Sequence, residues 1–395
     1  MDISYFDHAA STRTDPRVVE AMMPYFDTSY GNASELHQKG LEAKEALEDS
    51  RQLVADFIGA RPEEIVFTSG GTESDNLAVK GIAYRQRRRG KHIIISSVEH
   101  AAVYNSAMFL KREEGFDVTV LPVDREGFVD PADVESAIRE DTTLVSVIHG
   151  NNEIGTIEPV VEIGAVCKEH DVIFHTDAVQ TFGKVPIDVN TFNVDLLAAS
   201  SHKIYGPKGV GVLYVRKGVK PTPLMHGGDH EAKLRAGTEN ITGIVGLAKA
   251  VELCREGMGE ECERLRPLRD RLIDGVLEGT PTAYLNGPRD ERRLPNNAHF
   301  GIRYIEGESL MLRLDALGFQ VSTGSACSST SLEPSRTLIA IGLAHEDAHG
   351  SLRCTLGRWT RPEEVDAFIE ALPGVVKQLH AMSPLYADAM ERGEI

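Results

Sequence analysis

The sequence predicts an α/β protein in which a mostly parallel, seven-stranded sheet carries helices on both faces and is followed by a smaller α+β domain. Two observations support this. Short apolar runs alternate with helical periodicity up to about residue 255, and the alternation then stops. Alternation of this kind is typical of crossover units that join parallel strands. The chain has 395 residues, which is enough for two domains of ordinary size.

The elements of the large domain follow from periodicity and stop signals. A first long helix is expected over Glu42–Ile58, where apolar side chains recur at helical spacing and Gly59 follows as a terminator. Seven strand-like runs come next, at residues 64–69, 92–97, 117–123, 143–149, 171–176, 194–200 and 211–215. Helices are expected between them at residues 73–90, 100–114, 131–139 and 159–170. The last two strands are too close in sequence for a crossover helix, so we expect them to be antiparallel.

The pattern changes in the last third of the chain. A charged helix is expected over residues 260–277, and a final helix over residues 362–372. Between them lie the segments "LPNNAHFGI" and "GESLMLRLDALG" and a serine-rich loop. We therefore expect a large domain over residues 13–255. The small domain would combine residues 1–12 with 256–395 and would carry a mobile loop at about 322–335.

Charge and composition exclude several classes of function. The net charge of −18 argues against binding nucleic acid or an anionic membrane through a basic surface. The one basic run, "RQRRRGK" at residues 85–91, is expected to end a helix on a solvated face. No apolar run approaches the roughly 20 residues of a membrane span, and the N-terminus does not resemble a signal peptide. The cytoplasm is the expected location.

The cysteines give no sign of a disulfide framework or a structural metal site. There are five, an odd number, and no CxxC pattern occurs. At least one thiol must therefore be free.

Polar residues follow most of the predicted strands. They occur in "SGGTESDN", "SVEH", "GNNEIGT", "DAVQ" and "SSHK". In a parallel sheet these segments converge at the carboxyl edge, where ligands bind in such folds. The functional site is expected there.

Three of these segments each allow two interpretations. In "TSGGTESDN" (68–76), glycines and small hydroxyl residues at a helix start either bind phosphate or merely cap the helix. Asp177 is either a helix cap or the partner of a buried cation, such as a protonated pyridine nitrogen. His100 either caps a helix or stacks on a cofactor and transfers protons near neutral pH.

Lys203 lies between two hydrophobic strands in "LAASSHKIYGPKGVGVLYV". A partly desolvated lysine loses some preference for its charged form and becomes a competent nucleophile toward an aldehyde. An exposed hairpin lysine would explain the charge, but it would not explain the neighbouring Ser200, Ser201 and His202. A functional role is the favoured interpretation.

Cys327 lies in "VSTGSACSSTSLEPS" (321–335), among small polar residues that cannot fill a core. A thiol in such a loop can enter a site and leave it again. Arg353, in "SLRCTL", either grips a carboxylate bidentately or forms a surface salt bridge.

Taken together, these motifs closely resemble the cysteine desulfurases, which are class V aminotransferases on the fold-type I pyridoxal-phosphate scaffold. The resemblance covers residues 5–380, and its most specific part is "SHKIYGPKG" combined with "GSACSS". "FHTDAVQ" and "RAGTEN" look most like the nitrogen-fixation and iron–sulfur cluster type.

The resemblance implies pyridoxal 5′-phosphate as the cofactor and a role for each matching residue. Lys203 would form the Schiff base, and Asp177 would pair with the pyridinium nitrogen. Gln180 would bond the ring hydroxyl, and His100 would stack on the ring and move protons. The remaining cofactor contacts would come from Gly71, Thr72, Asn152, Ser200 and His202, with Thr238 supplied by the second subunit of a homodimer.

The resemblance also implies a reaction. Asn32, Asn152 and Arg353 would bind L-cysteine, and Cys327 would accept its sulfur as a persulfide, leaving L-alanine. An iron–sulfur scaffold protein or another acceptor would then take the sulfur, and Cys327 could ligate a cluster during that transfer. No other metal is implied, and a selenocysteine lyase or another class V aminotransferase is the alternative. One departure is His8, which stands where the family usually has asparagine.

Overall fold

The computed structural model describes residues 3–324 and 334–393. Its central sheet contains seven strands: β2 (Ile65–Thr68), β3 (His92–Ser96), β4 (Asp117–Leu121), β5 (Thr142–Ser146), β6 (Ile173–Asp177), β7 (Leu196–Ser200) and β8 (Gly211–Val215). Their spatial order is β2-β8-β7-β6-β5-β3-β4. Each predicted strand-like run overlaps one of these strands, which confirms the predicted sheet.

The strand directions also agree with the prediction. The neighbours from β7 to β4 pair in parallel, whereas β8 runs antiparallel to both β7 and β2. The carboxyl ends of β3, β5, β6 and β7 therefore meet at one edge. That edge carries the polar segments noted in the sequence.

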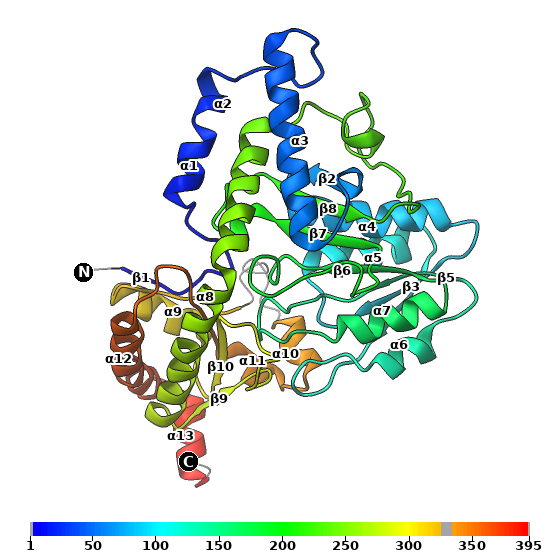
Figure 1. The fold of residues 1–395 in the computed structure, drawn as a ribbon. Coiled ribbons are helices and arrows are strands. Elements are labelled where there is room, and N and C mark those ends of the chain that lie inside the picture. The colour runs from blue at the N-terminus through cyan, green and yellow to red at the C-terminus, as the bar shows by residue number, and fades with distance from the viewer. Residues whose placement is uncertain (1–2, 325–333, 394–395) are drawn as a thin grey trace.

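Helices cover both faces of the sheet (Figure 1). The four predicted crossover helices correspond to α4 (Gly71–Gln86), α5 (Ala101–Glu113), α6 (Pro131–Ala137) and α7 (Val160–Glu169). The first long helix is α3 (Gln38–Ile58), and Gly59 ends it with a φ of 71°, a conformation that costs glycine little.

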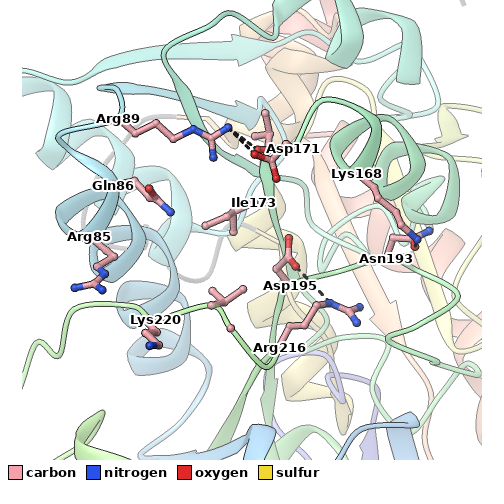
Figure 2. A pocket seen from close by; sticks show the side chains of 13 residues that line it. Arg85, Gln86, Arg89, Lys168, Asp171, Ile173, Asn193, Asp195, Arg216 and Lys220 are labelled. Atoms are coloured by element: carbon pink, nitrogen blue, oxygen red, sulfur yellow. Dashed lines mark hydrogen bonds and ion pairs between the residues drawn. The ribbon is translucent and has the colours of Figure 1, made fainter.

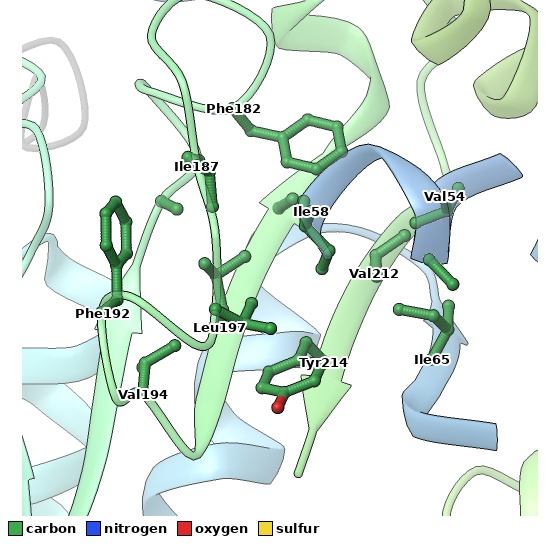
Figure 3. Close-up of a cluster of buried hydrophobic side chains, with 14 of the residues drawn as sticks. Val54, Ile58, Ile65, Phe182, Ile187, Phe192, Val194, Leu197, Val212 and Tyr214 are labelled. Atoms are coloured by element: carbon green, nitrogen blue, oxygen red, sulfur yellow. The ribbon is translucent and has the colours of Figure 1, made fainter. Parts of the chain in front are cut away.

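Alternating side chains of β8 show which apolar clusters cover the two faces of the central sheet. Val212 and Tyr214 join an apolar cluster with α3 and α7, whereas Leu213 and Val215 join a second cluster with α4 and α5. Figure 3 shows part of the first cluster, in which Val54 and Ile58 of α3 lie against Val212 and Tyr214. Apolar side chains thus cover both faces of this central strand, as is usual for a doubly covered sheet.

The last third of the chain builds a separate apolar cluster. It lies around a three-stranded antiparallel sheet of β12 (Ser351–Thr355), β10 (Asn297–Ile302) and β9 (Ala283–Leu285). The N-terminal strand β1 (Ser4–Tyr5) pairs in parallel with β11 (Phe319–Gln320) beside it. The helices of this region are α9 (Gly307–Ala316), α10 (Arg336–Ala340), α11 (His345–His349), α12 (Pro362–His380) and α13 (Pro384–Glu391).

One helix joins the two parts. The helix α8 (Ile241–Gly279) has 39 residues and passes from beside α3 to beside α12 (Figure 1). Cys254 belongs to the cluster at the large sheet, whereas Leu265 belongs to the C-terminal cluster. The helix predicted at 260–277 is therefore only the second half of α8. The domain boundary at residue 255 falls inside this helix and stays a prediction.

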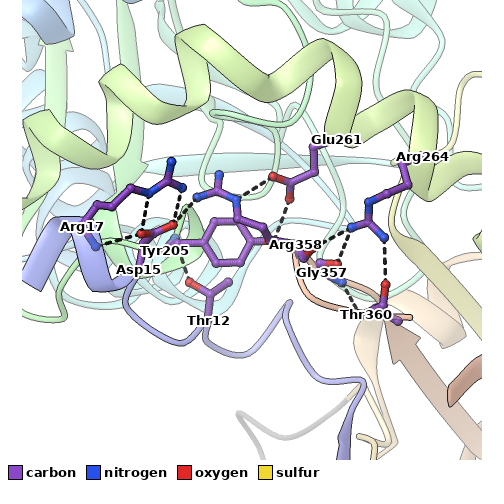
Figure 4. Close-up of polar contacts among 9 residues, drawn as sticks. All are labelled: Thr12, Asp15, Arg17, Tyr205, Glu261, Arg264, Gly357, Arg358 and Thr360. Atoms are coloured by element: carbon purple, nitrogen blue, oxygen red, sulfur yellow. Dashed lines mark hydrogen bonds and ion pairs between the residues drawn. The ribbon is translucent and has the colours of Figure 1, made fainter. Parts of the chain in front are cut away.

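A polar network ties the N-terminal segment to the rest of the chain (Figure 4). The Arg358 guanidinium pairs with Asp15 and with Glu261 of α8, at 2.9 Å each. The Tyr205 hydroxyl donates to Glu261 at 2.8 Å and accepts from the Arg358 amide at 2.7 Å. The loop after Lys203, α8 and the segment after β12 thus meet at one point.

The N-terminal segment also contains two short helices that the sequence analysis did not predict, α1 (Pro16–Met22) and α2 (Pro24–Asp27). Asp15 caps α1 by accepting a hydrogen bond from the Arg17 amide at 3.0 Å. Among the described residues, no helix combines the length and the apolar character that crossing a membrane requires.

Candidate active site

A cavity of about 350 Å³ lies at the carboxyl ends of β6 and β7. Ten of the residues predicted from the sequence line it: Gly71, Thr72, His100, Asn152, Asp177, Gln180, Ser200, His202, Lys203 and Arg353. They come from parts of the chain up to 282 residues apart (353 − 71). The parallel sheet thus brings these polar segments together, as expected.

Lys203 ends the short 3₁₀ turn Ser201–Lys203, directly after β7. Its Nζ donates hydrogen bonds to the backbone oxygens of Ala9 and of Ala10, the latter at 2.7 Å. The N-terminal segment is held there because the Thr12 amide donates to the His202 carbonyl at 2.9 Å. The amine therefore points into the cavity and is not on an exposed hairpin.

Asp177 is the last residue of β6 and is 3% exposed. Its Oδ1 accepts a hydrogen bond from the Val179 amide at 2.9 Å. Burial raises the pKa of Asp177, while the nearby charges of His100 and Lys203 oppose that shift. The carboxylate caps a turn and also faces the cavity, so its interpretation as the partner of a buried cation stays a prediction.

Two acidic residues near Asp177 were not predicted. Asp75 lines the cavity from α4, and its buried Oδ1 has no hydrogen-bond partner among the described residues. Its pKa is raised well above the usual value by burial and by the charge of Asp177. Burial also raises the pKa of Glu99 to about 8. Asp75 could have been found from the sequence, since it lies one helical turn after Gly71 on the same face.

His100 and Gln180 lie on two further walls. The His100 Nδ1 accepts from the Ala102 amide at 3.2 Å and so caps α5, while the residue also lines the cavity. The Gln180 Nε2 donates to the Ala9 carbonyl at 2.9 Å. One carbonyl, that of Ala9, thus receives hydrogen bonds from both Gln180 and Lys203.

The start of α4 has the features of an anion site. Gly70 stands at the N-cap and offers no side-chain cap, so amide groups of the first turn are left for another acceptor. The buried Ser200 Oγ has no hydrogen-bond partner among the described residues. A Cβ on Gly71 would lie 2.7 Å from the Val179 Cγ2. A larger residue there would push against the wall next to Asp177.

Arg353 comes from β12 and is 3% exposed. Its Nη2 pairs with Asp7 Oδ1 at 2.8 Å, and its Nη1 donates to the Asn152 carbonyl at 2.8 Å. Its Nε is buried without a partner among the described residues. The interpretation as a surface salt bridge is therefore wrong, because the guanidinium is buried at the wall of the cavity.

Three predicted residues are not brought to this cavity. Asn32 makes a local turn instead, since its Oδ1 accepts from the Ser34 amide at 2.9 Å. Thr238 is exposed and lies away from the cavity of its own chain. Cys327 lies outside the described residues. The four described cysteines, Cys167, Cys254, Cys262 and Cys354, form no disulfide.

His8 does not line the cavity but packs behind it. Its ring makes edge contacts with Tyr5 and Tyr205, and a Cβ on Gly357 would lie 2.3 Å from it. Burial is the main reason that the pKa of His8 falls to about 4. The histidine is therefore a neutral packing residue at ordinary pH.

A second cavity, of about 610 Å³, lies at the opposite end of the sheet, beside Ile173, the first residue of β6 (Figure 2). Arg85 and Arg89 of the basic run line it, together with Arg216 and Lys220. Its acidic residues are ion-paired, Asp171 with Arg89 at 3.2 Å and Asp195 with Arg216 at 3.4 Å. None of the predicted site residues is found there.

Comparison with known proteins agrees with the geometry. Residues 4–368 match the family described as aminotransferase class-V. The chain therefore belongs to the aminotransferase class-V family.

Curated relatives of the chain show to which group within this family it belongs. The chain is 52% identical over 391 residues to "Cysteine desulfurase IscS" of Clostridium botulinum, with 99% of this chain and 98% of the relative covered. It is 53% identical over 381 residues to the protein of the same name from Methanosarcina thermophila, with coverages of 96% and 94%. Within its family, the chain thus belongs to the cysteine desulfurases, which confirms the resemblance.

Solved structures support the fold. A "NifS-like protein" superposes with a TM-score of 0.90 at 38% identity, covering 95% of this chain and all of that one. A structure described as "SspA in complex with cysteine" has a TM-score of 0.78 at 38% identity, covering 89% and 98%. The predicted fold class is confirmed.

Proposed function

We propose that the protein is a pyridoxal-phosphate-dependent cysteine desulfurase that converts L-cysteine to L-alanine and leaves the sulfur as a persulfide on Cys327. The observation that carries this proposal is one cavity in which the amine of Lys203, the carboxylate of Asp177 and the guanidinium of Arg353 all converge. Its relatives named as cysteine desulfurases support the same reaction.

The described residues fit the cofactor. The unpartnered Ser200 Oγ and the uncapped start of α4, with Gly71 and Thr72, suit its phosphate. Asn152 and His202 complete the wall of the cavity. Asp177 would hold the pyridine nitrogen and Gln180 the ring hydroxyl, while His100 would lie against the ring. Pyridoxal phosphate, when bound, supplies an electron sink for a carbanion at the substrate Cα.

Lys203 would hold the cofactor covalently and, once released, take the α-proton of cysteine. The carbonyls of Ala9 and Ala10 accept its hydrogen bonds, which keeps the amine turned toward the cavity between these steps. Asp177 must be ionised to pair with a protonated ring. The nearby His100 and Lys203 favour that charge by lowering the pKa of Asp177 against the effect of burial.

Arg353 would bind the substrate carboxylate through its guanidinium. Asp7 and Asn152 hold that group from behind, each at 2.8 Å. The buried Nε without a partner is the donor that a carboxylate can satisfy. Asn32 was also predicted to contact substrate, but within one chain it is engaged in a local turn, so Arg353 is the better-supported ligand.

Sulfur transfer requires a nucleophilic thiol. The Cys327 thiolate would attack the substrate sulfur, so that an S–S bond forms and the C–S bond breaks. The electron pair of the C–S bond stays on carbon, and two proton transfers then give alanine. Elimination by a selenocysteine lyase and amino transfer need no such thiol, which is why we prefer desulfuration to these alternatives.

We also propose a homodimer. The N-terminal region exposes large apolar side chains, including Leu36 at 89%, Tyr30 at 71% and Phe26 at 66% exposure. Exposed apolar groups of this kind mark protein interfaces. Thr238, which is away from its own cavity, would reach the cofactor phosphate of the partner subunit. An iron–sulfur scaffold protein or another thiolation pathway in the cytoplasm would receive the sulfur.

The direct test is to incubate the protein loaded with pyridoxal phosphate with L-cysteine and a reductant and to measure alanine and sulfide. Equal amounts of both products are expected, and a parallel reaction without reductant should leave one added sulfur atom on the peptide that contains Cys327. The Cys327→Ser variant should keep the yellow colour of the cofactor and produce neither. Turnover of this variant at the wild-type rate would favour the lyase alternative.

A further inference from the structure

Glu153 lies in the segment "GNNEIGT" and directly follows Asn152, which lines the cavity. Its backbone is fixed on both sides, since its amide donates to Asn151 Oδ1 and its carbonyl accepts from Asn297 Nδ2, both at 2.9 Å. Its carboxylate is not explained by the cofactor contacts proposed above. Such a rigidly held carboxylate near a substrate site needs another role.

The carboxylate hydrogen-bonds to a residue on one side of the segment bearing Cys327 and lies close to a residue on the other side. On one side, the Ser335 hydroxyl donates to Glu153 Oε2 at 2.5 Å. On the other side is Gly324, where a Cβ would lie 3.5 Å from the same oxygen and 3.0 Å from the His299 Nε2. Gly324 has a φ of 82° and is packed between Glu153 and His299, so glycine is required there.

Further contacts strengthen this junction. Thr337 of α10 lies near the same carboxylate, and its hydroxyl favours the charged form of Glu153 by lowering its pKa. Burial raises the pKa of Glu153, while the Ser335 hydrogen bond and the positive charge of Arg353 oppose that shift. The same side chain thus bonds Ser335 and lies close to Gly324, which are described residues on either side of residues 325–333.

From these contacts we infer that Glu153 is a positioning residue for sulfur transfer: it fixes Gly324 and Ser335, the two attachment points of the Cys327 segment, beside Arg353. This inference rests on the proposed function. It requires that Glu153 affect the delivery of the Cys327 thiol to the substrate sulfur. Binding of the cofactor and of cysteine should not depend on it.

The test compares Glu153→Gln with Glu158→Gln in the full-length, cofactor-loaded protein. Glu158 is a matched control because it is buried on the same loop, but its carboxylate accepts from the Val129 amide. Losing a charge-assisted hydrogen bond should lower kcat and the rate of persulfide formation on Cys327 by about tenfold in Glu153→Gln. The KM for cysteine and the visible cofactor band should stay unchanged, and Glu158→Gln should behave as wild type.

A second variant keeps the inference testable if Glu153→Gln does not fold. Thr337→Val removes one hydroxyl donor, keeps the side-chain volume and leaves Glu153 in place. It should slow persulfide formation several-fold. In the double variant, which also carries Glu153→Gln, the rate should fall by less than the product of the two single fold-losses. Wild-type persulfide formation in Thr337→Val and in any folded Glu153→Gln protein would overturn the inference, as would a loss confined to KM or to the cofactor band.

The two proposals fail in different ways. If the unmodified protein forms no alanine from cysteine, the proposed function is wrong and the inference falls with it. If the unmodified protein is active and Glu153→Gln matches it, the inference alone is wrong.

Discussion

The two ends of the central sheet carry cavities of opposite character. At the amino end, beside Ile173, the acidic side chains are paired with arginines, and Asp171 is 94% exposed. At the carboxyl end of the same strand, five residues long, Asp177 is 3% exposed and lies near Asp75, whose Oδ1 has no hydrogen-bond partner among the described residues. The larger of the two cavities is thus the one whose acidic side chains are both ion-paired. Buried and incompletely paired charges mark the site better than volume does.

The direction of the strands explains the difference. Helices that follow parallel strands start at the carboxyl end, so their free amides and positive dipole ends face that edge. The same arrangement leaves helix ends at the amino edge, where basic residues such as Arg85 in the last turn of α4 are favourable. Anion and cofactor binding is therefore expected at one edge only.

The largest effect is expected for substitution of Lys203, which lies at the carboxyl end of the sheet. Lys203→Ala should abolish the visible band of the bound cofactor and lower turnover by about three orders of magnitude or more, because no other group supplies both the linkage and the proton transfer. The control is Lys208→Ala, an exposed lysine of the same hairpin. Absorption spectra and alanine formation measure both variants, and a surviving band in Lys203→Ala would contradict the account.

A smaller but still large effect is expected for substitution of Asp177. Asp177→Asn should lower kcat by about a hundredfold or more, because a neutral amide does not stabilise a protonated ring during proton removal. Asp171→Asn, two residues before the start of the same strand, should leave kcat unchanged. Equal losses in the two variants would show that the comparison between the two ends is wrong.

The third prediction concerns stability. Burial raises the pKa of Glu99 from 4.5 to about 8, so the folded state binds more protons than the unfolded state between these values. The stabilisation that Glu99 contributes is full below pH 4.5 and is lost as the pH rises through about 8. At about 1.4 kcal/mol per pKa unit, Glu99→Gln should gain stability relative to wild type by a few kcal/mol as the pH rises. Urea unfolding at several pH values measures this, and a pH-independent difference would contradict it.

The smallest effects should occur at the amino-end cavity. Arg89→Ala removes a largely exposed ion pair, and Lys220→Ala removes an exposed charge of the same cavity. They should change the free energy of unfolding by about 1 kcal/mol or less and leave turnover unaltered. A large loss of activity in either variant would mean that this cavity takes part in the reaction.

Much of the fold followed from periodicity, because apolar alternation reports which residues must be buried. The seven strands, the crossover helices and the antiparallel β7–β8 pair were all predictable in this way. The strand order was not, since nothing local in Ile65–Thr68 indicates that it pairs with β8. The length of α8 was also missed, because its two halves bury different apolar faces against different clusters.

The place of a residue was predictable where it lies at the end of a strand or in the turn after it, as for Asp177 and Lys203. Residues whose place in the site depends on tertiary contacts were harder to predict. Asp7 and the carbonyls of Ala9 and Ala10 reach the cavity only because the N-terminal segment packs beside β7 and β12. The neutral state of His8 depends likewise on its burial against Gly357, which no local pattern encodes.

The central claim is that the chemistry is built on Lys203 at the carboxyl edge of the sheet. Reduction of the cofactor-loaded protein with borohydride, followed by peptide mass spectrometry, tests it directly. The account predicts that the added mass lies on the peptide containing Lys203. Modification of another lysine instead, such as the half-buried Lys184, or of no lysine at all, would contradict it.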